Sequence, residues 1–406
     1  MKKLVSSVLA ASMVLSLAAC GSSASSAAES TAASSDAAST AATAEAGEGS
    51  GAYTGTPIKI GGIGPITGAA AVYGQAVKNA EELAVKEINA ANGSDVFEWK
   101  FEDDEHDAEK AVNAYNNLKD WGMQVLIGTT TSAPCIAVVE KTHADNMFQI
   151  TPSGTAVECV QYDNAYRMCF SDPTQGTESA KYIGENGMAQ KVAVIYDSSD
   201  VYSTGIYEAF AAEAANQPFE IVSVEAFTAD AKTDFSVQVQ KSKDAGADLL
   251  FMPFYYTEAS LVLAECNKQG YEPTFFGCDG MDGILGVENF DTALAEGLTF
   301  LAPFVAKSED EQVQNFVSKY EADYGETPNQ FAADAYDCVY VVKAAIEAAG
   351  ATPDMNVSDL CDAMKEAMTS VSYSGITGKD ITWGEDGEPN KAPLVVKVVD
   401  GEYTEL

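Results

Sequence analysis

The feature that most constrains the fold is a repeated change of hydrophobic period between residue 57 and the C-terminus. Short apolar runs, which are typical of buried strands, alternate with stretches of roughly 10–15 residues whose apolar positions recur at helical spacing. In the first unit, residues 58–63 read as a buried strand, and apolar positions from 76 to 88 mark the helix that follows. This alternation predicts βαβ units and a mainly parallel sheet.

The same pattern continues through the chain, and the last stretch, 381–406, is β-rich with Asp400-Gly401 as a hairpin turn. Further strands are expected at 97–102, 124–127, 147–150, 191–196, 219–227, 248–253 and 274–277. Further helices are expected at 107–121, 133–145, 174–187, 203–216, 234–245, 256–269, 309–323 and 329–349. Because this body is longer than one comfortable core, we expect an α/β fold with two sheets.

The N-terminus has the features of an export signal. Lys2 and Lys3 precede an apolar run over residues 4–17, and Leu-Ala-Ala then leads directly into Cys20. The run is too short to span a bilayer stably, and the order of residues matches the lipobox of bacterial lipoproteins. We therefore expect a signal peptide over 1–19 and lipidation of Cys20. An ordinary signal peptide with an incidental cysteine is the alternative.

The segment after the cysteine has low complexity, since 31 of the 36 residues at 21–56 are Ala, Ser, Thr or Gly. Such a composition buries too little apolar surface to offset the entropy lost on ordering. A flexible coil of this length spans about 30–35 Å. We expect a disordered tether over 20–56, with transient helix as the alternative because of the alanines.

Composition argues against several classes of function. The chain has 61 Asp and Glu against 23 Lys and Arg, and Arg167 is the only arginine, so we expect no nucleic-acid partner. The seven cysteines after Cys20 contain no Cys-x-x-Cys, and His106 and His143 are the only histidines, so we expect no metal and no cofactor. His106 itself lies in an acidic run, which favours a solvated turn over a metal site. Hydrolase motifs are missing, although abundant carboxylates keep an extracellular hydrolase as a remote alternative.

Two hydroxyl-rich loops follow strands of the first predicted sheet, where ligands of open α/β sheets bind. The loop at 128–134 opens a helix, whose free N–H groups and dipole favour an anion, and the loop at 150–155 lies on the same edge. We expect Ser132, Ser153 and Thr155 to hold one carboxylate group without an arginine. Helix capping and turn formation are the alternative roles of these side chains.

The corresponding loops of the second predicted sheet carry a carboxylate and aromatic rings. Asp279 lies in a turn after one strand, and Tyr255 follows the preceding strand. This combination suits an ammonium group, through charge pairing and cation–π contact. Tyr73 and Tyr202 each open a helix after a strand and are further candidates for the wall of a site. A turn-forming role for the aspartate and simple packing of the tyrosines are the alternatives.

A series of short motifs runs through the body in a specific order. They are Ile58-Lys59-Ile60-Gly61, Val72-Tyr73-Gly74, Ala84-Val85-Lys86-Glu87-Ile88-Asn89, Asp103-Asp104, Val125-Leu126-Ile127-Gly128, Ile150-Thr151-Pro152, Asp172-x-x-Gln175-Gly176 and Ala180-Lys181-Tyr182-Ile183. In this order and spacing the chain resembles the type I periplasmic binding proteins, specifically the group that binds leucine, isoleucine and valine. The resemblance implies two doubly wound lobes joined by a three-segment hinge, as in a Venus flytrap, and no enzymatic activity.

The resemblance also implies lobe boundaries and roles in the site. One lobe comprises 57–173 plus 303–378, and the other comprises 174–302 plus 379–406. The three hydroxyl residues named above bind the α-carboxylate of an amino acid, while Tyr255 and Asp279 bind its amine. The tyrosines at positions 73 and 202 close over the ligand.

The function implied is that of an extracytoplasmic lipoprotein, anchored to the bacterial membrane through Cys20, that serves an ABC importer. It captures an amino acid as a monomer and delivers it to the permease subunits; a lipoprotein sensor for an amino acid, amide or small carboxylate is the alternative. Position 279 holds Asp where leucine binders hold Glu, and His106 replaces a disulfide cysteine of some members. Thr130 and Thr131 stand where leucine binders have more apolar groups, which weakens the case for a purely aliphatic ligand.

Overall fold

The structure is a computed structural model that describes Thr43–Ala44 and residues 55–406. The predicted signal peptide, Cys20 and most of the predicted tether lie outside the described residues. Within the tether segment, Thr43–Ala44 (β1) pairs in parallel with Ser372–Tyr373 (β12). No helix in the described part of the chain combines the length and apolar character needed to cross a membrane.

The first sheet contains five parallel strands in the order β3-β2-β4-β5-β6. They are β2 (Ile58–Gly64), β3 (Phe97–Asp103), β4 (Val125–Gly128), β5 (Phe148–Thr151) and β6 (Ala165–Arg167). Every residue of β4 and β5 is buried, as expected for central strands of a sheet that is covered on both faces.

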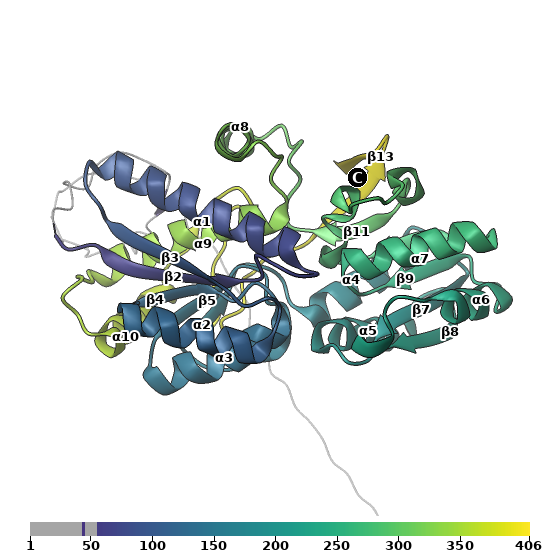
Figure 1. The fold of residues 1–406 in the computed structure, drawn as a ribbon, viewed down its shortest axis with the longest axis horizontal. Helices are drawn as coiled ribbons and strands as arrows, with labels where there is room; N and C mark the ends of the chain where they lie inside the picture. The colour runs from purple at the N-terminus through teal and green to yellow at the C-terminus, as the bar shows by residue number, and fades with distance from the viewer. Residues whose placement is uncertain (1–42, 45–54) are drawn as a thin grey trace, which may run out of the picture. The chain divides into compact units, whose positions relative to one another are not determined.

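Helices cover both faces of this first sheet (Figure 1). Side chains of one face pack against α1 (Ala71–Asn92), α9 (Gln330–Ala349) and α10 (Val357–Met368). Those of the other face pack against α2 (Ala108–Trp121) and α3 (Ser132–Asp145). The helix α9 arrives from far along the sequence, so this lobe is built from two separate stretches of chain.

The second sheet has seven strands in the order β14-β13-β11-β10-β9-β7-β8. They are β7 (Lys191–Asp197), β8 (Glu220–Phe227), β9 (Leu249–Met252), β10 (Thr274–Gly277), β11 (Thr299–Ala302), β13 (Leu394–Val399) and β14 (Glu402–Glu405). The pairs are parallel except that β13 runs antiparallel to both β11 and β14.

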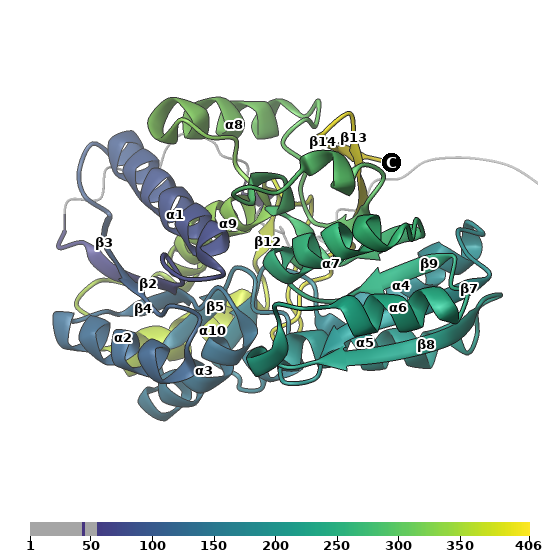
Figure 2. The ribbon, with the colours of Figure 1, turned by 45° about the vertical axis from the view of Figure 1, so that its right-hand side comes forward.

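This second sheet is also covered on both faces (Figure 2). One face packs against α4 (Asp172–Glu185) and α5 (Val201–Ala214), and the other against α6 (Ser236–Asp244) and α7 (Tyr256–Gln269). A further helix, α8 (Glu311–Tyr324), is joined to α1 by the ion pair between Lys86 and Asp323. Two doubly wound α/β sheets confirm the predicted fold class.

Local residues explain where several helices begin and end. The Asp107 carboxylate accepts a hydrogen bond from the Lys110 amide and caps α2, and the Asn329 side chain caps α9 in the same way. Gly93 ends α1 with φ of 73°, a left-handed conformation that glycine adopts without strain. The last residue of α1 is therefore Asn92.

The last passage of the chain between the two sheets lies later than the sequence indicates. Ile381 and Trp383 pack in the core of the first sheet, although the boundary was expected at 378. The Trp383 indole also donates a hydrogen bond to the Arg167 carbonyl of β6. These residues belong with the first lobe because a large aromatic side chain finds its apolar surroundings and its polar partner there. The other predicted boundaries stay a prediction.

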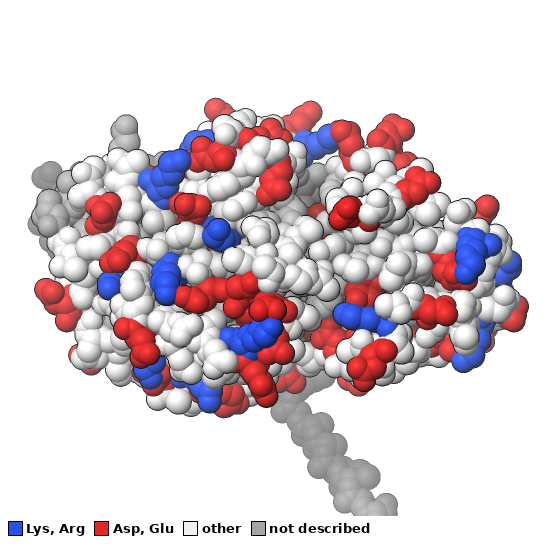
Figure 3. Space-filling model, viewed as in Figure 1, with Lys and Arg blue, Asp and Glu red and all other residues white. Residues whose placement is uncertain are grey.

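The structure also shows how the charged side chains and the cysteines of the body are distributed. Acidic side chains are spread over the face drawn in Figure 3, and the basic side chains lie scattered among them. All seven described cysteines are unpaired and buried. The described residues contain no cluster of three or more His, Cys, Asp or Glu side chains arranged to hold a metal ion.

Candidate functional site

Loops that follow strands of both sheets meet around one small cavity. Its lining comprises Tyr73, Thr130, Thr131, Ser132, Ser153, Tyr202, Tyr255, Asp279, Gly280 and Phe331. Six of the seven predicted ligand-binding residues are in this set, and Thr155 is the exception. The cavity lies at the carboxyl ends of the strands, where open α/β sheets place their ligands.

The cavity is nearly filled by its own walls. Its volume is about 10 Å³, roughly the space of one water molecule. The two lobes touch here, because the Tyr73 hydroxyl donates to the Gly280 carbonyl over 2.6 Å and the Tyr256 hydroxyl donates to the Ala69 carbonyl over 2.9 Å. A ligand the size of an amino acid therefore enters only when these contacts between the lobes break.

Ser132 and Ser153 play different parts in the first-lobe wall. The Ser132 hydroxyl oxygen accepts hydrogen bonds from the amides of Thr155 and Ala156, both at 3.2 Å, so its own hydrogen stays free to donate. The Ser153 hydroxyl donates to the Thr130 carbonyl over 2.6 Å, so its hydrogen is already used. Of the two serines, only Ser132 offers a donor to an anion.

Two threonine hydroxyls of the first-lobe loops, one in the cavity lining and one outside it, lack hydrogen-bond partners among the described residues. The hydroxyls of Thr130 and Thr155 are buried and unpartnered. A buried polar group left without a partner costs about 1–3 kcal/mol, which a ligand that supplies an acceptor recovers. Thr130 lines the cavity, so a residue predicted as part of a side-chain pocket is also a potential donor to an anion.

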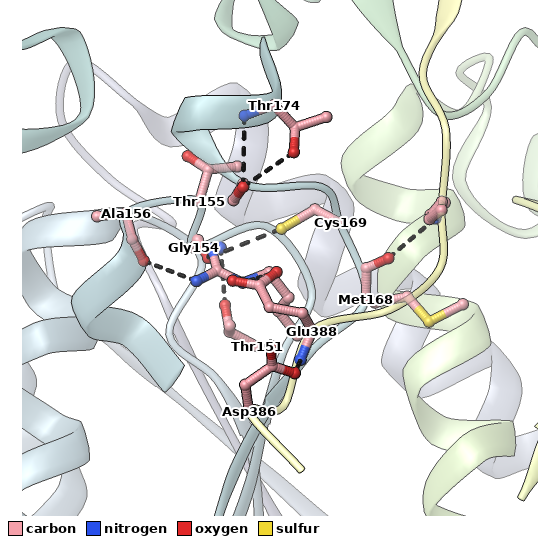
Figure 4. Close-up of polar contacts among 12 residues, drawn as sticks. Thr151, Gly154, Thr155, Ala156, Met168, Cys169, Thr174, Asp386 and Glu388 are labelled. Carbon is pink, nitrogen blue, oxygen red and sulfur yellow. Dashed lines mark hydrogen bonds and ion pairs between the residues drawn. The ribbon is translucent and has the colours of Figure 1, made fainter. Parts of the chain in front are cut away.

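The only arginine of the chain lies behind this wall. Its guanidinium is fully buried, and it donates to the carbonyls of Gly154 and Ala156, both over 2.9 Å. Its Nε lies 3.1 Å from a Glu388 carboxylate oxygen. Figure 4 shows Gly154, Ala156 and Glu388 around this contact. Arg167 thus fixes the shape of the loop from behind through two of its carbonyls.

The second-lobe wall centres on Asp279, in a short 3-10 helix (Asp279–Met281) that follows β10. The Tyr202 hydroxyl donates to the Asp279 carboxylate over 2.6 Å. The Gln175 side chain accepts from the Asp279 amide, and the Gln330 side chain donates to its carbonyl. These contacts hold the Asp279 turn in one position. Gln175 belongs to one of the short motifs in the sequence, although no role was predicted for it, and Gln330 was not singled out at all.

Burial controls the charge of this carboxyl group. It raises the pKa of Asp279 to about 6, and the hydrogen bond from Tyr202 opposes part of that rise. The Tyr202 and Tyr255 rings stack with centroids 4.7 Å apart, beside the carboxyl group. An acidic group set among aromatic faces in a desolvated site matches an ammonium ion.

His106 lies in the expected turn between exposed acidic residues, but its ring is partly buried and belongs to the surroundings of the site. The imidazole Nδ1 lies 2.9 Å from the Thr131 hydroxyl, and the ring meets Tyr255 edge-on with centroids 5.5 Å apart. Burial lowers the pKa of His106 to about 4, so the ring is neutral at pH 7. It contributes packing and a hydrogen bond rather than charge.

Comparison with known proteins shows the family of this chain. Residues 57–402 match the family described as periplasmic binding protein. The chain belongs to this family. Its fold and its family are those of solute binders without enzymatic activity.

Named relatives within the family bind branched-chain amino acids. The Leu/Ile/Val-binding protein homolog 3 of Brucella melitensis is 30% identical over 76% of this chain and 83% of its own length. A leucine-binding protein from Thermotoga maritima is 25% identical with a TM-score of 0.78, covering 86% of this chain and 97% of its own. A branched-chain amino acid transporter substrate-binding protein from Streptococcus pneumoniae, solved with isoleucine, is 27% identical with a TM-score of 0.77 and covers 86% of this chain and 100% of its own.

Proposed function

We propose that this chain is the extracytoplasmic solute receptor of an ABC importer, and that it captures an amino acid, branched-chain or related. The observation that carries the proposal is the opposition of two kinds of wall across one cavity. The first lobe offers hydroxyl donors at a helix start, and the second offers a buried carboxyl group beside aromatic rings. An amino acid has the matching pair of charges on adjacent groups.

Binding proceeds in two stages in this proposal. The ligand carboxylate first meets the donors of Ser132 and Thr130 at the start of α3 on the open first lobe. Closure then brings Asp279 and Tyr255 onto the ammonium group and excludes water. Charge-assisted hydrogen bonds contribute about 1.5–3 kcal/mol each, so contacts at both ends of the ligand suffice for a micromolar Kd, which needs about −8 kcal/mol.

The lining also contains residues that can meet the side chain of the ligand. Besides the groups assigned to the two charges, the lining contains Thr131, and Phe331 and Tyr73 supply apolar surface. A mixed lining of this kind accepts a small aliphatic or hydroxylated side chain. We therefore expect isoleucine, valine and threonine to be the informative ligands to compare.

Anchoring and delivery complete the proposal. The lipobox at Cys20 supports lipidation, and the low-complexity segment after it supports a tether that holds the receptor near the permease. The family of the chain supports an extracytoplasmic location. Mass spectrometry of the N-terminal peptide of the mature protein tests the anchor, because an unmodified peptide that begins at residue 20 contradicts it.

Calorimetric titration of the refolded, ligand-free protein with amino acids tests the proposed ligand class. Asp279→Ala is expected to weaken binding by about tenfold or more, since it removes a charge-assisted contact. The exposed Asp230 provides the matched control, and Asp230→Ala is expected to bind like the wild type. If Asp279→Ala binds as tightly as the wild type, the carboxyl group does not hold the amine and the assignment is wrong.

A further inference from the structure

A second and much larger cavity lies between the two lobes, away from the first. Its volume is about 600 Å³, within the usual range for small-molecule sites, and the two cavities share no lining residue. One wall is the start of α1 with the segment 326–329. The other wall comes from β11, β13, β14 and a short 3-10 helix (Ile284–Gly286).

Most of the wall surface is apolar, and the charges in it are mainly negative. The apolar part is provided chiefly by Val72, Phe300, Phe304, Tyr320, Val396 and Tyr403. The four charged side chains of the lining are Asp282, Lys307, Glu326 and Glu402. Lys307 forms an ion pair with Glu402, which leaves two carboxylates without a cation among the lining residues. A positively charged group is therefore favoured in this space.

The Asp282 carboxyl group is a polar group in the mainly apolar wall of this cavity. Its side chain is only 5% exposed; Oδ2 accepts a hydrogen bond from the Gln330 amide over 2.9 Å, and Oδ1 has no hydrogen-bond partner among the described residues. Burial raises the pKa of this carboxyl to about 6, so it is charged at pH 7.5. A buried carboxylate oxygen without a partner is costly, which makes it a point where a ligand gains binding energy.

The Tyr403 hydroxyl lies at the same end of the cavity. It accepts a hydrogen bond from the Gly283 amide over 3.1 Å, directly after Asp282 in the chain. A carboxyl group and a hydroxyl group thus lie close together in the wall of a mainly apolar cavity. A molecule with an apolar body and a terminal ammonium group satisfies both.

We propose that this cavity is a second binding site, and that it takes a small apolar molecule carrying one protonated amine. The apolar body packs against the aromatic and aliphatic walls, and the ammonium group donates to Asp282.

The second site is linked to the first through one residue. Gln330 lies at the start of α9. Its backbone N–H donates a hydrogen bond to the Asp282 carboxylate, and its side-chain NH₂ donates one to the Asp279 carbonyl. Asp279 lines the first cavity and Asp282 lines the second, three residues apart on the same turn. Both sites therefore share this turn and draw their walls from both lobes.

The test uses three compounds that share one apolar body: 4-phenylbutylamine, 4-phenylbutanol and 4-phenylbutyrate. Binding to the purified chain is measured by calorimetry at pH 7.5. The amine is expected to bind at least tenfold more tightly than the alcohol, and the carboxylate is expected not to bind. Absence of amine binding, or equal binding of the carboxylate, overturns the proposal.

Two variants locate the bound amine. Asp282→Asn is expected to weaken amine binding by about tenfold. Gly286→Phe is expected to weaken it at least about tenfold, because Gly286 lines the cavity and an added Cβ there meets no atom within 4 Å, so the fold accepts a large ring at the cavity wall. This second variant decides the matter if Asp282→Asn does not fold. If Asp279→Ala removes amine binding while Gly286→Phe leaves it intact, the amine occupies the first cavity and the proposal is wrong.

Discussion

Arg167 is expected to contribute more to stability than any exposed cation of the described residues, although it lies behind the binding loop and does not line the cavity. Replacing it in Arg167→Met leaves the carbonyls of Gly154 and Ala156 without their guanidinium donors. Each buried acceptor that loses its partner costs about 1–3 kcal/mol. The loss of the ion pair with Glu388 adds less, because that carboxylate is 30% exposed. The free energy of unfolding should therefore fall by about 3–5 kcal/mol, the range for breaking a buried charged contact.

Guanidinium chloride unfolding followed by circular dichroism measures this loss. Arg167→Lys keeps the charge but not the two-pronged geometry, so an intermediate loss of about 1–3 kcal/mol is expected. Lys181→Met is the matched control: this exposed lysine pairs with Glu178 at the surface, and its removal should change stability by less than about 0.5 kcal/mol. If Arg167→Met unfolds within 1 kcal/mol of the wild type, the two carbonyl contacts do not stabilise the loop.

Two further predictions concern pH and packing. Burial raises the pKa of Asp279 and Asp282 to about 6, above the ordinary 3.8, so the folded state keeps protons that the unfolded chain releases. The free energy of unfolding of the ligand-free protein should therefore fall as the pH rises from about 4 to 7. Urea unfolding midpoints at several pH values measure this fall. In Asp279→Asn the midpoint should depend less steeply on pH, and an unchanged dependence would contradict the assignment. Separately, Gly74→Ala places a Cβ 2.2 Å from the Pro65 carbonyl oxygen and should cost about 1–3 kcal/mol. Gly286→Ala, in open space, should cost far less, and equal midpoints for the two variants would contradict the packing argument.

Much of the fold was accessible from the sequence because its signals are local. A buried strand and the helix that follows it each show their period within a few residues, so the helix predicted at 256–269 coincides with α7. The strand β6 was not predicted, because a segment of three residues is too short to show a hydrophobic period. The helix α10 was missed as well, although its apolar residues recur at helical spacing.

The candidate site was predictable in its location but not in its detailed contacts. The rule that ligands lie beyond the carboxyl ends of strands located Tyr73, Ser132 and Asp279 around one cavity. Which hydroxyl keeps a free hydrogen depends on contacts between separate loops, such as that from Ser153 to the Thr130 carbonyl. No periodicity or motif spacing encodes such a contact.

The order of strands in the second sheet has a consequence for how the chain acquires its structure. The strand β11 ends at residue 302, yet its neighbour β13 begins at residue 394, and much of the intervening chain helps build the first lobe. Neither lobe is a contiguous stretch, so a chain that emerges N-terminus first cannot finish one before starting the other. Bringing such distant segments together costs loop-closure entropy before any contact repays it, which slows folding. The first lobe therefore needs the chain up to about Trp383, and the second sheet is complete only once β13 and β14 have emerged.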